Sequence, residues 1–266
     1  MRDVLPPSLV DAYERLGPMV VAFSGGVDSA FLAASAAGVL GPGAVRAVTA
    51  VSPSLGADEL AHCEQIATEW SLDWSTVATG EMDDPRYLVN AADRCYWCKS
   101  HLMDALAPFA DHATVVLGVN LDDLGDHRPG QVAASERGAR FPFVEAGLTK
   151  ADVRTHARAI GLTAWDRPAA PCLSSRLPYG TPVTLGRLTA VELAERGLHR
   201  LGLREVRVRH HGDVGLVEVP ASDFDAAVAQ RAEVTEIVRA AGFRFVALDL
   251  EGFESGRLNR VHQEPE

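Results

Sequence analysis

Short apolar runs alternate with segments of helical periodicity in the first part of the chain. The runs read as strands because they are brief, rich in β-branched residues and alanine, and bounded by turn residues. Between them, apolar side chains recur every three or four positions, as they do on the buried face of a helix. This alternation predicts an α/β fold with a doubly wound parallel sheet. The expected strands cover residues 19–23, 44–51, 74–78 and 114–119.

The pattern changes after a linker rich in proline and glycine at residues 168–182. Beyond it, helical and alternating segments follow in an order typical of a small α+β domain with its own sheet. We therefore expect two domains, a larger one over residues 1–180 and a smaller one over residues 181–266. Gly212 and Asp213 separate two alternating runs and predict a hairpin turn. The expected elements are a helix over 189–201, strands over 205–210 and 214–219, a helix over 223–240 and a strand over 243–250.

The loop after the first expected strand carries the most informative motif. Residues 23–29 read Phe-Ser-Gly-Gly-Val-Asp-Ser. Paired glycines allow a tight turn and a close backbone approach, and a helix that begins at the loop directs N–H groups toward an anion. A Walker loop is excluded, since the chain has no G-x-x-x-x-G-K-[ST] string. The loop resembles an ATP-pyrophosphatase loop, which implies attack at the α-phosphate of ATP; an ordinary tight turn is the alternative. The residues expected to bind ATP here are Ser24, Gly25, Gly26, Asp28 and Ser29.

Composition limits the classes of function. The chain has 266 residues, of which 47% are hydrophobic, as in a soluble globular protein with a substantial core. Its net charge of −11 provides no basic field for a nucleic-acid backbone, so we expect no nucleic-acid partner. No apolar stretch reaches about 18 residues, and the first residues lack the basic-then-apolar order of a signal peptide. We therefore expect a cytoplasmic protein with no membrane partner.

We expect the four cysteines to act as metal ligands or reactive thiols rather than to form disulfides, because cysteines of a cytoplasmic protein are kept reduced. Cys63 falls on the apolar face of an expected helix and is assigned to the core. Cys95 and Cys98 form a C-x-x-C pair, followed much later by Cys172. The pair suits a redox dithiol, half of a zinc site with a residue such as His101, or a three-cysteine iron–sulfur cluster with one open iron. Three thiols favour the cluster, with a chance pair as the remaining alternative.

Carboxylates gather after the fourth expected strand, at Asp122, Asp123 and Asp126. In an open α/β sheet, ligands bind at the carboxyl ends of the strands. Asp122 and Asp126 are the oxygen ligands expected for Mg²⁺ bound to the ATP phosphates. Each one taken alone also suits a helix cap or an Asx turn. Farther on, Thr149 reads as the N-cap of a helix that opens with Lys150, which we expect on a solvated helix face rather than on a phosphate.

Arg207 and Arg209 alternate on an expected strand, so both side chains point to one face. A pair of this kind can hold a phosphate through parallel hydrogen bonds. Two exposed arginines that only improve solubility are the alternative. In an acidic chain, this local density of arginine predicts a small anionic ligand rather than a polynucleotide.

In their order and spacing, these motifs resemble the LarE family of ATP-dependent sulfur transferases, which help to build the nickel-pincer nucleotide cofactor. The resemblance covers most of the chain, and no single motif would suffice for it. It implies that the enzyme adenylylates the two carboxylates of pyridinium-3,5-biscarboxylic acid mononucleotide and converts them to thiocarboxylates. It also implies a homo-oligomer. The motifs that carry it are residues 24–29, 94–99, 122–130, 145–150, 165–180, 206–213 and 248–253.

The resemblance assigns the handling of sulfur to Cys172. In one branch of the family, Cys95, Cys98 and Cys172 would hold a [4Fe-4S] cluster that delivers the sulfur, whereas in the other branch Cys172 gives up its own sulfur. Pro171 departs from the family pattern, which has a small residue at this position. The expected catalytic residues are Ser24, Asp28, Cys172 and Arg176, with Arg176 or Arg167 favouring the Cys172 thiolate.

The same resemblance assigns the phosphate of the substrate to Arg207 and Arg209. Glu195 and Glu218 fall where the family places acidic groups near a subunit contact, unless they are ordinary surface carboxylates. Two other functions stay open at this point. One is a tRNA thiolase, which would share both the C-x-x-C pair and the cluster, and the other is a non-enzymatic module that binds a nucleotide and a cluster.

Overall fold

The computed structural model describes residues 1–125, 128–168 and 170–253. The chain divides into two compact units, and each is described by itself. The first comprises Met1–Tyr87 and Asp93–Ala170, and the second comprises Leu88–Ala92 and everything from Pro171 onward. Among the described residues, none of the helices combines the length and the apolar character needed to cross a membrane.

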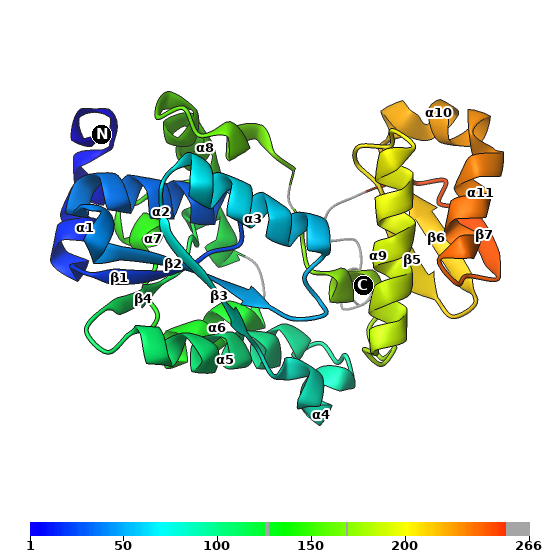
Figure 1. Cartoon of the computed structure of the whole chain (residues 1–266), viewed down its shortest axis with the longest axis horizontal. Coiled ribbons are helices and arrows are strands. Elements are labelled where there is room, and N and C mark those ends of the chain that lie inside the picture. The colour runs from blue at the N-terminus through cyan, green and yellow to red at the C-terminus, as the bar shows by residue number, and fades with distance from the viewer. Residues whose placement is uncertain (126–127, 169, 254–266) are drawn as a thin grey trace. The chain divides into compact units, whose positions relative to one another are not determined.

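The first unit is built on a parallel sheet with the strand order β3-β2-β1-β4 (Figure 1). The chain leaves β1 for β2 and β3 on one side, then returns to pair β4 with the other side of β1. The carboxyl ends of β1 and β4 therefore form the switch point at which open α/β sheets bind ligands. The strands are β1 (Met19–Ala22), β2 (Val45–Val51), β3 (Asp73–Ala78) and β4 (Thr114–Val116).

Helices cover both faces of this sheet, with α5 and α6 on one side and α1, α2 and α8 on the other (Figure 1). Successive side chains of β1 point to opposite faces of the sheet, as they do along any strand. Val21 packs with α1, α2, α3 and α8, whereas Val20 packs with α5 and α6. The expected doubly wound α/β fold is confirmed. The helices are α1 (Pro7–Leu16), α2 (Val27–Leu40), α3 (Ala57–Glu69), α4 (Pro85–Leu88), α5 (Arg94–Leu106), α6 (Pro129–Glu136), α7 (Pro142–Glu145) and α8 (Lys150–Ala159).

The second unit has a three-stranded mixed sheet in the order β5-β6-β7. β5 (Arg207–His211) and β6 (Val214–Glu218) are antiparallel, and β7 (Phe245–Leu248) runs parallel to β6. The hairpin turn expected at Gly212 and Asp213 is confirmed, and Gly212 supplies the positive φ of +64° that such a turn favours. The helices of this unit are α9 (Leu185–Arg200), α10 (Phe224–Ala229) and α11 (Arg231–Ala240).

Two helix boundaries differ from expectation. α9 begins four residues earlier than expected, at Leu185, because the Thr184 side chain accepts a hydrogen bond from the Arg187 N–H and caps the helix. The single helix expected over 223–240 is broken at Gln230, whose φ and ψ of −96° and 23° separate α10 from α11.

A short segment before α5 belongs to the second unit because of Asn90. This residue is fully buried, with a positive φ of 58°. Its side-chain amide donates to the carbonyls of Leu177, Pro178 and Thr181 at 3.3, 2.9 and 2.8 Å. One buried amide thereby fixes the loop that precedes α9, which is consistent with the rule that buried polar groups are hydrogen-bonded.

Candidate functional site

The loop between β1 and α2 is held by its own serines. The Ser24 N–H donates to Ser29 Oγ at 3.1 Å, and that hydroxyl donates to the Gly26 carbonyl at 3.2 Å. The two serine hydroxyls lie 3.1 Å apart. Gly26 precedes α2 in an extended conformation, and no side chain caps the helix. The start of α2 thus presents backbone N–H groups and two hydroxyls together, which is an arrangement suited to an anion.

Gly25 is required where it stands. Its φ is +70°, and a Cβ added to it would lie 3.0 Å from Cys63 Sγ and 3.2 Å from the His62 ring. The loop therefore rests directly on α3. Cys63 is buried as expected, and burial raises its thiol pKa to about 11, so it is a core residue rather than a nucleophile.

Asp28, in the first turn of α2, is the centre of a small polar cluster. Its Oδ2 accepts from Lys150 Nζ, and its Oδ1 accepts from the Asn120 amide at 3.3 Å. Lys150 opens α8, whose capping box joins Thr149 and Asp152. Lys150, expected on a solvated helix face, is 38% exposed at its side chain and also forms an ion pair with Asp28, which the sequence did not indicate.

Gly118 lets the end of β4 approach this cluster. A Cβ at this position would lie 2.8 Å from the Asp28 carbonyl carbon, closer than real side chains come to a backbone. Gly118 and Asn120 were not singled out from the sequence. Their position directly after a buried strand of a parallel sheet was the available signal, because such positions line the ligand edge.

Asp122 and Asp123 shape the loop that follows β4. Asp122 accepts a hydrogen bond from the Lys150 N–H at 2.5 Å, and its own N–H donates to the Asn120 side-chain carbonyl at 3.1 Å. Asp123 accepts from the Asn120 N–H at 3.1 Å and pairs with Arg128 at 2.7 Å. Asp126, the other expected Mg²⁺ ligand, lies outside the described residues. Asp28 and Asp122 are hard oxygen donors at one sheet edge, which fits Mg²⁺ held through few protein ligands and several waters.

The C-x-x-C pair lies in the first two turns of α5. Cys95 is exposed and Cys98 is half-buried, and the Arg94 guanidinium lies 3.9 Å from Cys95 Sγ. Two soft thiols one turn apart fit a soft metal or an iron–sulfur cluster. His101, considered above as a zinc ligand, instead binds Asp84 through Nε2 at 3.0 Å.

No three metal-ligating side chains gather within the part of the chain that the structure describes. Cys172 belongs to the second unit, whereas Cys95 and Cys98 belong to the first. The three-cysteine cluster and its [4Fe-4S] composition therefore stay predictions.

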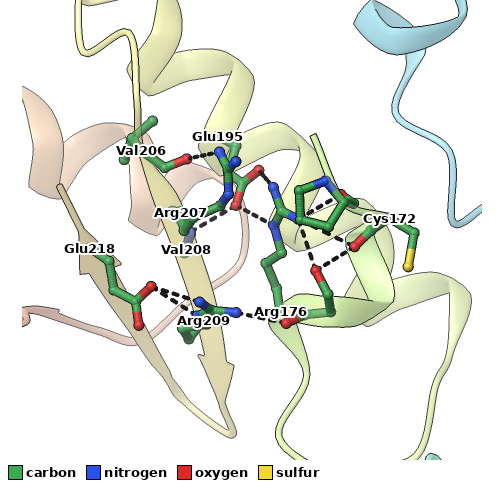
Figure 2. A network of polar contacts seen from close by, with 10 residues as sticks. Cys172, Arg176, Glu195, Val206, Arg207, Val208, Arg209 and Glu218 are labelled. Atoms are coloured by element: carbon green, nitrogen blue, oxygen red, sulfur yellow. Dashed lines mark hydrogen bonds and ion pairs between the residues drawn. The ribbon is translucent and has the colours of Figure 1, made fainter. Parts of the chain in front are cut away.

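Cys172 is exposed and immediately precedes a short 3₁₀ helix, Leu173–Arg176. Arg176 is buried and donates to the carbonyls of Pro171 and Cys172 at 2.7 and 3.3 Å. It also forms a bidentate ion pair with Glu195, in which Nε and Nη2 each lie 2.9 Å from a carboxylate oxygen. Figure 2 shows the Cys172 sulfur pointing away from this network. Arg176 thus holds the backbone of the cysteine loop, and its charge is matched by a carboxylate.

Arg167, the other expected activator of the thiol, is also engaged by a carboxylate. Its guanidinium binds both carboxylate oxygens of Glu59 at 2.8 and 2.9 Å. Glu59 is on α3, in the first unit. Neither Arg176 nor Arg167 therefore presents an unmatched positive charge.

Arg207 and Arg209 are both 7% exposed, so the alternative of two solubilising surface arginines is wrong. Arg209 pairs with Glu218 at 2.9 Å and donates to the Ser175 carbonyl at 2.7 Å (Figure 2). Arg207 donates to the Val206 carbonyl at 3.0 Å, and its pKa is lowered by burial and by Arg176.

The alternative of ordinary surface carboxylates is equally wrong, because Glu195 and Glu218 are 5% and 3% exposed. Glu195 also accepts from the Val208 N–H at 2.9 Å, which ties α9 to β5. A network of charged pairs thus supports the loop that carries Cys172.

Relatives among known proteins span nearly the whole chain. It is 44% identical over 254 residues to an uncharacterized protein of Synechocystis sp., with 94% of each chain covered. It is 36% identical over 255 residues to the pyridinium-3,5-bisthiocarboxylic acid mononucleotide synthase of Lactiplantibacillus plantarum, with 95% of this chain and 92% of the synthase covered. An uncharacterized protein of Methanocaldococcus jannaschii is 23% identical over 240 residues, 89% of this chain and 91% of the relative. No protein-family profile matches.

The motifs quoted from the sequence and the similarity to the synthase agree. Because 36% identity extends over 95% of the residues, the chain belongs to the LarE family.

Proposed function

We propose that this chain is an ATP-dependent sulfur transferase. It adenylylates the carboxylates of pyridinium-3,5-biscarboxylic acid mononucleotide and converts them to thiocarboxylates. The synthase of Lactiplantibacillus plantarum, named for the corresponding bisthiocarboxylic acid product, supports this substrate. The observation that carries the proposal is the loop at the switch point, whose backbone N–H groups and serine hydroxyls suit an anion, with Asp28 held between Asn120 and Lys150.

Adenylylation is the step that the first unit would perform. A carboxylate resists displacement of its oxygen by sulfur until ATP turns that oxygen into a good leaving group. In the proposed reaction, the carboxylate oxygen attacks the α-phosphate, an acyl-adenylate forms, and pyrophosphate leaves. The N–H groups at the start of α2 and the hydroxyls of Ser24 and Ser29 bind the departing pyrophosphate. Mg²⁺ bound at Asp28 and Asp122 would neutralise phosphate charge.

Sulfur delivery is the step assigned to the cysteines. Cys95, Cys98 and Cys172 would hold the [4Fe-4S] cluster, which supplies a replaceable sulfide when it is bound. Without a cluster, the Cys172 thiolate attacks the acyl-adenylate and releases AMP. Elimination then removes the Cα proton of Cys172 to a base in solvent and breaks the Cβ–Sγ bond, which leaves dehydroalanine in the chain and releases the substrate as a thiocarboxylate. For Arg176 and Arg209, the buried ion pairs of the second unit support a role in positioning the Cys172 loop.

The test is an anaerobic assay of the purified chain with ATP, Mg²⁺, sulfide and the biscarboxylic mononucleotide. We expect AMP, pyrophosphate and a product whose mass shows oxygen replaced by sulfur. Asp28→Asn should slow AMP formation on the order of 100-fold, because it removes a negatively charged ligand of the Mg²⁺ that would neutralise the phosphates. Asp73→Asn, which breaks an exposed pair with Arg46, is the matched control. If AMP forms at the same rate without the mononucleotide, or only when tRNA is present, the chain is a different enzyme and the proposal is overturned. If no AMP forms at all, the result favours a module that binds a nucleotide without reaction.

Measuring the iron content and the mass of the protein chain distinguishes the two routes of sulfur delivery. The cluster route predicts about four irons per chain, lost in Cys95→Ala while AMP formation continues. Cys63→Ala, which removes the buried thiol, should keep the iron. A chain without iron that loses the mass of H₂S in one turnover would contradict the cluster route and support sacrifice of Cys172. If Cys95→Ala also abolishes AMP formation, the result would instead show that Cys95 is needed for the structure of the enzyme.

A further inference from the structure

Trp97, which lies between the two thiols of α5, is held on two sides. Its indole N–H donates to the Asp93 carboxylate at 2.8 Å. The Arg86 guanidinium lies over its ring, 3.7 Å from the centroid. Tyr96 packs edge-on against the same ring at 5.0 Å, and its hydroxyl donates to Glu136 at 2.7 Å. Both residues between Cys95 and Cys98 are therefore anchored by side chains outside the motif.

Asp84 is the buried end of this arrangement. It is 6% exposed, yet four donors meet its carboxylate. Its Oδ1 accepts from the Arg86 N–H at 2.9 Å and from Arg86 Nε at 3.0 Å. Its Oδ2 accepts from Arg86 Nη2 at 2.8 Å and from His101 Nε2 at 3.0 Å. Hydrogen bonds from Arg86 hold the pKa of this carboxyl well below its usual range, so it stays charged.

Arg86 depends on Asp84 for its place on the ring. Its side chain is 59% exposed, and an exposed cation over an aromatic ring is attracted only weakly. A long, exposed side chain also loses rotamer freedom when it is fixed in one geometry. The bidentate pair with a buried carboxylate supplies the missing constraint, because it fixes both the direction and the plane of the guanidinium.

We propose that Asp84 is a positioning residue for the thiol pair of Cys95 and Cys98. Through Arg86 it fixes Trp97, and with Trp97 the turn of α5 from which both thiols project. Partners that orient metal ligands without touching the metal commonly set its affinity. The inference rests on the proposed use of Cys95 and Cys98 as ligands, and it adds a residue that is not itself one of the proposed ligands.

The test measures how tightly the thiol pair binds a soft metal in the absence of ATP and substrate. The parent is the full chain with Cys172→Ser, which leaves Cys95 and Cys98 as the thiols outside the core. It is titrated anaerobically with Cd²⁺, and binding is followed by the thiolate-to-metal absorbance. We expect Asp84→Asn and Arg86→Gln each to weaken Cd²⁺ binding about tenfold. The double variant should be no weaker than either single one, because both act through one contact.

Two controls separate positioning from loss of structure. Asp73→Asn removes an exposed aspartate–arginine pair on β3 and should leave the Cd²⁺ affinity unchanged. Arg86→Gln changes an exposed side chain, so it tests the inference even if Asp84→Asn fails to fold. Urea unfolding of each variant shows whether the fold is intact.

Parent-like Cd²⁺ affinity in a folded Arg86→Gln or Asp84→Asn chain would overturn the inference. Tenfold effects that add up in the double variant would also overturn it, since the two residues would then act separately. A parent that binds no Cd²⁺ would overturn the ligand role of the pair and this inference together. Failure of the adenylylation assay would not affect the titration, because neither ATP nor the mononucleotide is present in it.

Discussion

At the scale of single residues, charged side chains in this protein are matched by specific partners. Lys150 binds Asp28, Arg176 binds Glu195, and Arg209 binds Glu218. The residue types were visible in the sequence, and they suggested anion binding or solvated surfaces. The partners were not visible, because each pair joins two different elements, whose packing against each other the sequence does not give. Burial of a charge is tolerated only with such a partner, so the pairing accounts for the buried positions of Arg176 and Arg209, whereas Lys150 stays partly exposed.

The pair of Arg176 and Glu195 provides a prediction about stability. Glu195→Gln would leave a buried guanidinium without its counter-charge, and we expect the free energy of unfolding to fall by about 3 kcal/mol. Urea unfolding measures the loss. Asp73→Asn, at an exposed pair, should cost at most about 1 kcal/mol. A loss of this smaller size for Glu195→Gln would mean that the buried pair contributes no more than a surface one.

At the scale of elements, the ends of strands position the proposed ATP site. The sequence predicted all four strands of the first sheet and the helix after the glycine loop. It placed the end of β4 too late, because the apolar run continues past Val116 although the chain leaves the sheet there. Leu117 instead donates its N–H to the Arg140 carbonyl at 3.0 Å. This departure brings Gly118 onto Asp28.

Gly118→Ala tests that close approach. The added methyl group must push on the Asp28 backbone, so we expect a loss of about 1–3 kcal/mol in unfolding free energy together with slower AMP formation. Gly186→Ala is the matched control, because a Cβ there meets nothing within 4 Å and alanine favours the helix. It should be neutral or slightly stabilising by urea unfolding. Equal behaviour of the two variants would show that the segment after β4 is not tightly packed against α2.

At the scale of the whole molecule, each unit has a histidine whose pKa is lowered chiefly by burial. His62 lies beneath the glycine loop, and His210 packs on Phe243 with its ring centroid 5.1 Å away. Lowered pKa values mean that the unfolded chain binds protons at a higher pH than the folded one. The stabilisation is therefore complete above about pH 6.5 and declines as the pH falls through the folded-state values.

His210→Asn tests this dependence in the second unit. We expect the wild-type chain to lose stability between pH 7 and pH 5, and the variant to lose less. The difference should be under about 1 kcal/mol, since the ring is half-exposed and solvent screens it. Urea unfolding at several pH values gives the slope. Identical slopes for wild type and His210→Asn would contradict the assignment.

The sequence by itself determined the α/β class, the order in which strands and helices follow one another along the chain, the glycine loop, the burial of Cys63 and the family. These follow from periodicity, local turn chemistry and motif order, which act over a few residues at a time. Only the tertiary structure decided that Lys150 binds Asp28, that Gly118 touches α2, and that Arg207 and Arg209 are buried. Those facts depend on which distant segments pack together, and burial and charge pairing are properties of that packing rather than of any one segment.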